Sequence, residues 1–158
     1  MNTLIIIAIL AGTPLVLSLL FRLNAIALFL AVATGALLAQ YIADDASLVI
    51  SAFSPKANVG SYVQIGLLIL PFALSLLFLR KTLSASKVML HILPLVVTSL
   101  AFTTLIIGYL PGGVQHDIVT DPIGKTINSA QNVLIAASAA LTMIVAWITM
   151  GPKGHRKH

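Results

Sequence analysis

The chain has 158 residues, of which 59% are hydrophobic and only 8% are charged, whereas a soluble domain carries about 25% charged residues. A domain of this size cannot hide so much apolar surface from water, so the composition excludes a soluble globular protein and predicts an integral membrane protein. The net charge is +5, and because the basic residues flank hydrophobic segments, we expect membrane lipid as the partner rather than nucleic acid.

The apolar runs have the length of membrane-spanning helices, and they lack the alternation typical of barrel strands. Lipid-exposed segments must satisfy their own backbone hydrogen bonds, which favours helices. We therefore predict an all-α fold, a single transmembrane domain over residues 1–158 with about five transmembrane helices and a short outer interfacial helix. The predicted spans are 4–21, 24–43, 61–79, 88–110 and 129–150.

The first two spans form a tight hairpin, because only Arg22 and Leu23 separate them. The segment from Asp44 to Ala57 follows, and we interpret it as the interfacial helix because an aspartate can cap its first turn and Pro55 ends it.

A polar turn, residues 80–87, joins the third span to the fourth, which stops at Pro111-Gly112-Gly113. Residues 111–128 are predicted to be a polar loop, and residues 151–158 a basic tail that contacts the anionic inner leaflet.

The basic residues predict the orientation of the chain. With the N-terminus outside and the C-terminus in the cytoplasm, seven of the nine Lys and Arg residues lie on the cytoplasmic side, as the positive-inside rule requires. These seven are Arg22, Arg80, Lys81, Lys87, Lys153, Arg156 and Lys157. We expect a multipass protein of the plasma membrane with this topology.

Two segments share the pattern P-x-x-L-S-L-L-F, at residues 14–21 and 71–78. Both end the predicted outside-to-inside spans, so the pattern is compatible with a duplicated hairpin. The alternative is a chance match between leucine-rich segments.

No Asp, Glu, Lys or Arg lies in the hydrophobic core of a predicted span, which argues against a proton-coupled transporter. Prolines inside three spans, Pro14, Pro71 and Pro94, are candidate helix kinks. Such kinks can serve as hinges or expose carbonyl groups to a pore, but we favour kinks that neighbouring hydroxyl groups compensate.

Small residues recur every four positions in the second span, at Ala27, Ala31, Gly35 and Ala39. They lie on one helical face and predict close helix packing. Ser138 and Thr142 predict a similar face in the fifth span. Contact within one chain and contact between identical chains both fit these faces.

Uncharged polar residues give possible lining for a pore: Gln64, Thr98 and Asn132. A pore can be lined by hydroxyl and amide groups without charges. The alternative is that these groups bond to their own helix or lie at the membrane interface. We find no pattern of catalytic residues, so we expect no enzyme, no cofactor and no metal site.

The tight first hairpin, the outer interfacial segment and the basic tail resemble the layout of small multipass proteins of the colicin V production family. The resemblance concerns layout alone, and this chain carries an additional span, so we assign no family. Two functions remain. The preferred one is a homo-oligomeric channel or permeation protein, and the alternative is a non-catalytic membrane scaffold or accessory subunit.

Overall fold

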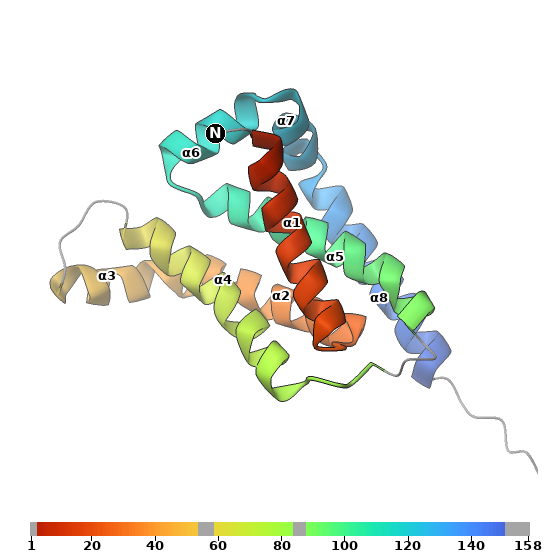
Figure 1. The fold of residues 1–158 in the computed structure, drawn as a ribbon. Helices are drawn as coiled ribbons and strands as arrows, with labels where there is room; N and C mark the ends of the chain where they lie inside the picture. Colours follow the sequence, from red (N-terminus) through yellow and green to blue (C-terminus); the bar gives the residue numbers. More distant parts are fainter. Residues whose placement is uncertain (1–2, 54–58, 84–87, 151–158) are drawn as a thin grey trace, which may run out of the picture.

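The computed structural model describes residues 3–53, 59–83 and 88–150, and every regular element in these ranges is a helix. The all-α prediction is therefore confirmed for the described residues. The basic tail, residues 151–158, lies outside them. The elements are α1 (Thr3–Leu20), α2 (Ala25–Tyr41), α3 (Ala43–Phe53), α4 (Val59–Phe78), α5 (Val88–Tyr109), α6 (Gly112–Thr120), α7 (Pro122–Ser129) and α8 (Gln131–Met150) (Figure 1).

Helix α5 lies at the centre of the bundle, in contact with α1, α2, α4 and α8. Of the 18 residues of α5 that could cross a membrane, 61% are buried inside the protein, whereas the corresponding share is 11% for α4 and 17% for α8. The core around it joins α2, α4 and α5, with the rings of Phe72 and Phe102 packed at a centroid distance of 5.3 Å. Helices α4 and α8 therefore bury only one narrow face each within the chain, and most of their apolar surface faces outward.

The number of spans is smaller than predicted. Three helices, α4, α5 and α8, are long and apolar enough to cross a membrane, and a fourth span exists only if α2 and α3 count as one broken span. Three to four spans are fewer than the predicted five. The apolar part of α1, Leu4–Leu20, is shorter than α4, α5 and α8 and is not among these spans.

The second span and the interfacial segment meet at a sharp bend. Helices α2 and α3 differ in direction by 61° across Ile42. Helix α3 begins at Ala43 and ends at Phe53, with Asp44 and Asp45 in its first turn, and residues 54–57 of the predicted helix lie outside the described residues. It packs against α4.

The predicted polar loop at residues 111–128 is wrong, because this segment forms α6 and α7. Asp121 caps α7 by accepting a hydrogen bond from the Ile123 backbone N–H at 3.0 Å, and Pro122 occupies the first turn, where its missing N–H costs nothing. The buried side chain of Ile118 in α6 packs with Ile7 and Ile107. The two short helices thus cover the end of the bundle at which α1 begins (Figure 1).

The three internal prolines lie inside uninterrupted helices, Pro14 in α1, Pro71 in α4 and Pro94 in α5. In α1, the buried Ser18 hydroxyl donates a hydrogen bond of 2.6 Å to the carbonyl of Pro14. The prolines therefore do not divide the helices in which they lie.

Candidate functional site

Helices α2 and α4 cross at Gly35. A Cβ atom at this position would lie 2.5 Å from the backbone oxygen of Leu68 and 3.0 Å from its Cα, so only glycine allows the two backbones to approach this closely. Of the other small residues on this face of α2, Ala31 and Ala39 are buried and Ala27 is half-buried. The part of this face from Ala31 to Ala39 thus packs within the chain.

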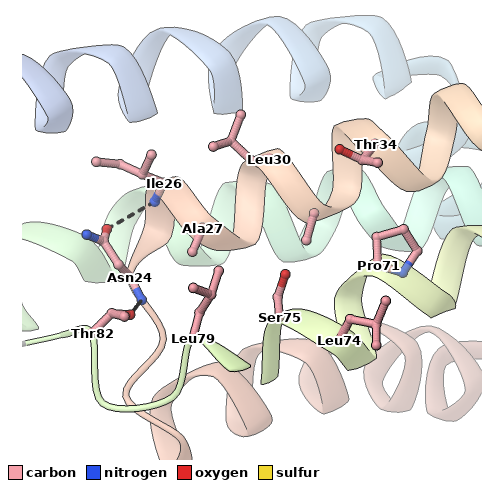
Figure 2. A pocket seen from close by; sticks show the side chains of 11 residues that line it. Asn24, Ile26, Ala27, Leu30, Thr34, Pro71, Leu74, Ser75, Leu79 and Thr82 are labelled. Atoms are coloured by element: carbon pink, nitrogen blue, oxygen red, sulfur yellow. Dashed lines mark hydrogen bonds between the residues drawn. The ribbon is translucent and has the colours of Figure 1, made fainter. Parts of the chain in front are cut away.

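A groove opens between the same two helices beyond Ala31, on the side of the crossing that leads to the start of α2 and the end of α4. Figure 2 shows α2 on one side of it and α4 on the other. Its volume is about 420 Å³, and its lining consists of Asn24, Ile26, Ala27, Leu30, Ala31, Thr34, Pro71, Leu74, Ser75, Leu79 and Thr82. Ala27 and Ala31, the first two small residues of this face of α2, therefore line the groove.

The polar end of the groove is fixed by hydrogen bonds of Asn24. Its side-chain oxygen accepts from the Ile26 backbone N–H at 3.1 Å, which caps α2, and its own backbone N–H donates to the Thr82 hydroxyl at 3.1 Å (Figure 2). These bonds connect the beginning of α2 to the segment after α4.

The groove can hold an apolar chain but offers little chemistry. None of its lining residues is titratable, and the polar groups along its length are the hydroxyls of Thr34 and Ser75, which Figure 2 shows on opposite walls. General acid–base catalysis needs a positioned titratable group. The groove therefore fits a hydrocarbon chain or an apolar helix better than a polar substrate.

Hydroxyl groups concentrate inside the bundle, on α5 and on the face of α8 that packs against it. The fully buried ones are Thr98, Ser99, Thr103 and Thr104 of α5 and Ser138 of α8, with Thr142 at 4% exposure. Several bond to their own helix, as hydroxyls in apolar helices commonly do; Thr103 donates to the Ser99 carbonyl at 2.9 Å. Ser138 and Thr142 thus lie in an intramolecular contact.

The three residues predicted to line a pore do not meet. Gln64 is half-buried near the beginning of α4, Thr98 is fully buried in α5, and Asn132 is exposed at the beginning of α8. Figure 1 shows α4 and α8 on different sides of the bundle. These three side chains therefore cannot line one pore within a single chain as it is folded here.

The exposed face of α8 combines small and large residues. Asn132, Ala136 and Ala140 are exposed at four-residue spacing in its first half, and Met143 and Trp147 are 73% and 81% exposed in its second half. Small residues on an outward face allow a second helix to approach closely. This face is separate from the one that carries Ser138 and Thr142.

Among the described residues, no three His, Asp or Glu side chains lie close enough to hold a metal ion. The groove residues Thr34 and Ser75 were not predicted from the sequence as site residues, although Ser75 belongs to the repeated P-x-x-L-S-L-L-F pattern. The sequence of one helix does not show where a neighbouring helix separates from it. No sequence pattern therefore predicted the groove between α2 and α4. Comparisons with family models, with curated proteins and with solved structures find no match to this chain.

Proposed function

We propose that this protein is a multipass membrane protein of the plasma membrane that acts as a non-catalytic, self-associating scaffold or accessory subunit. The observation that carries the proposal is the outward exposure of α4 and α8, of which only 11% and 17% are buried within one chain. A subunit that works by contact with other membrane helices needs such free apolar faces, whereas an enzyme needs a pocket in which a few polar groups converge.

The placement of polar groups supports a scaffold over a channel. Thr98, Ser138 and Thr142 face the interior of a single chain, so they are not available to line an axis between several chains. Below Asn132, the exposed face of α8 continues with Ala136 and Ala140. An axis formed by this face would be apolar over most of its length, and apolar constrictions exclude water and ions.

The proposal includes the predicted orientation, with the N-terminus outside and the C-terminus in the cytoplasm, and the positions of the charged residues support it. The basic residues Arg22, Arg80 and Lys81 come together where the segments after α1 and α4 hydrogen-bond to each other. Asp117 and Asp121 belong to the opposite end of the bundle, where α7 contacts α1. With the basic end inside, the distribution follows the positive-inside rule.

Permeation remains the second candidate, because the hydroxyl oxygens of Thr98, Ser99 and Thr142 are buried and make no hydrogen bond within the described residues. Three such groups in the centre of a bundle are the type of lining that a narrow path for small neutral solutes would use. A flux assay with the purified protein in liposomes separates the two candidates. Solute flux above that of empty liposomes would place permeation first.

Crosslinking tests self-association through α8. The chain contains no cysteine, so Ala136→Cys and Ala140→Cys each introduce the only thiol. We expect oxidation in native membranes to convert these variants into dimers of twice the 16.6 kDa chain mass, because small residues allow the two helices to approach within disulfide distance.

The matched control is Leu70→Cys, an exposed position halfway along α4. It tests random collision on a face of large side chains, and it should form dimers more slowly than the α8 variants do. If Leu70→Cys forms dimers as fast as the α8 variants, or if neither α8 variant forms them, self-association through this face is wrong.

A further inference from the structure

A small cavity lies at the joined ends of α1 and α4. It has a volume of about 290 Å³ and is lined by Leu20, Phe21, Arg22, Arg80 and Lys81. Three of its five lining residues are cations, and the other two are apolar. Cations near the C-terminal end of a helix complement its unpaired backbone carbonyls, and here three of them gather at the ends of two helices.

Backbone hydrogen bonds hold the two basic segments together. The Lys81 N–H donates to the Phe21 carbonyl at 2.8 Å, and the Leu83 N–H donates to the Arg22 carbonyl at 2.8 Å. Leu23 and Leu83 are almost completely buried, at 0% and 3% exposure. The cations are therefore attached to an anchored framework rather than to two independent turns.

Two of the cations occupy left-handed backbone conformations, with φ of 51° for Arg22 and 64° for Lys81. Arg22 stands where α1 ends in a Schellman motif: the Leu23 N–H bonds to the Ser18 carbonyl and the Arg22 N–H to the Leu19 carbonyl. Glycine is the usual residue at such a position. A long cationic side chain is present there instead, on a turn that these backbone hydrogen bonds hold.

The electrostatic balance at the pocket is positive. The C-terminal ends of α1 and α4 contribute roughly half a negative charge each, against three full positive charges from Arg22, Arg80 and Lys81. No carboxylate of the described residues pairs with these cations, since the aspartates of α3, α6 and α7 belong to other parts of the fold. The pocket therefore keeps a surplus of positive charge that an anion can neutralise.

The apolar surroundings identify the kind of anion. Leu20 is 72% exposed beside the cations, and Leu77 and Phe78 at the end of α4 are 64% and 78% exposed. A free phosphate ion would gain nothing from such apolar neighbours, whereas a phospholipid presents a phosphate and an acyl chain together. Basic pockets between membrane helices bind anionic headgroups in this way.

We propose that Arg22, Arg80 and Lys81 bind the phosphate of an anionic membrane lipid, whose acyl chain lies along Leu20 and the end of α4. The guanidinium groups suit this role because they donate two parallel hydrogen bonds to one phosphate. This inference rests on the membrane placement in the proposed function, but it does not depend on self-association.

Native mass spectrometry in a neutral detergent tests the proposal, with phosphatidylglycerol, phosphatidylcholine and inorganic phosphate as separate probes. The wild type should bind phosphatidylglycerol more tightly than phosphatidylcholine. Arg80→Gln should weaken phosphatidylglycerol binding by about fivefold, and Arg80→Gln with Lys81→Gln by more, because each basic side chain near a membrane contributes a similar increment. The control Lys125→Gln, an exposed charge on α7, should bind as the wild type does.

Three outcomes would overturn the proposal. The first is equal lipid binding by the wild type and the double variant, and the second is an equal loss in Lys125→Gln, which would indicate a general effect of charge. The third is displacement of the lipid by inorganic phosphate at a similar concentration, which would assign the pocket to free phosphate. The same spectra report the mass of the complex, so a lipid-bound monomer would contradict self-association while supporting the lipid site.

Discussion

At the scale of single residues, Gly35 is a position where the fold leaves no room for a side chain. We expect Gly35→Ala to lower stability by about 1–3 kcal/mol, as overpacked contacts do, because the new Cβ atom would lie 2.5 Å from the Leu68 backbone oxygen. A backbone atom cannot move aside as the end of a flexible side chain can. The midpoint of thermal aggregation in detergent should therefore fall.

The control for this variant is Gly66→Ala in α4, where no atom lies within 4 Å of the added Cβ. Alanine stabilises helix interiors relative to glycine by about 1 kcal/mol, so its aggregation midpoint should stay unchanged or rise. If both variants lower the midpoint equally, the drop in stability comes from replacing any glycine, and the close approach to Leu68 is not its cause.

The stripe that contains Gly35 was readable from its four-residue spacing, but its neighbour was not. The spacing places Ala27, Ala31, Gly35 and Ala39 on one face, and small residues indicate only that something can approach. Leu68 carries no complementary signal, since its backbone and not its side chain makes the contact. Whether the stripe would serve one chain or two was therefore open in the sequence.

At the scale of elements, α7 depends on its N-terminal cap. Asp121→Ala removes the side-chain acceptor for the Ile123 N–H, and lost caps cost about 1 kcal/mol. In a helix of eight residues, this loss should be visible as about fivefold faster hydrogen exchange of the α7 amides.

Asp117→Ala provides the comparison for this variant. Asp117 contributes its backbone carbonyl to the Thr120 hydroxyl at 3.2 Å, and alanine keeps that carbonyl. Exchange in α7 should therefore remain as in the wild type. Faster exchange of α7 in both variants would mean that the negative charge, and not the cap, stabilises the helix.

The apolar helices were predictable and the short polar helices were not, for a physical reason. Long apolar runs identify α4, α5 and α8 within a few residues, because only a helix satisfies the backbone in lipid. Helices α6 and α7 lie among Gly, Pro and Asp residues, which are typical of turns. The pair Asp121-Pro122 was nevertheless a recognisable helix start, since it joins a capping residue to a proline in the first turn.

At the scale of the whole molecule, the orientation can be tested directly. We expect Thr120→Cys in α6 to react with a membrane-impermeant maleimide in intact cells, and Ser84→Cys to react only after permeabilisation. The reason is that Ser84 follows the basic residues Arg80 and Lys81 in sequence, and an excess of Lys and Arg marks the cytoplasmic side.

The wild-type chain contains no cysteine. Any maleimide signal from the wild type is therefore non-specific and serves as the background for both variants. Labelling of Ser84→Cys in intact cells, with protection of Thr120→Cys, would show the inverted orientation. Labelling of both positions would require an even number of membrane crossings between them.

The hydrogen bonds between the turns after α1 and α4 have a consequence for biosynthesis. The Asn24 N–H finds its partner on Thr82, 58 positions later in the chain, and the carbonyls of Phe21 and Arg22 bond to Lys81 and Leu83. While the chain emerges from the ribosome, these groups of the first turn have no partner yet and stay hydrated. Their water can be released only after the end of α4 has been synthesised, so the turn after α1 joins the turn after α4 late in synthesis.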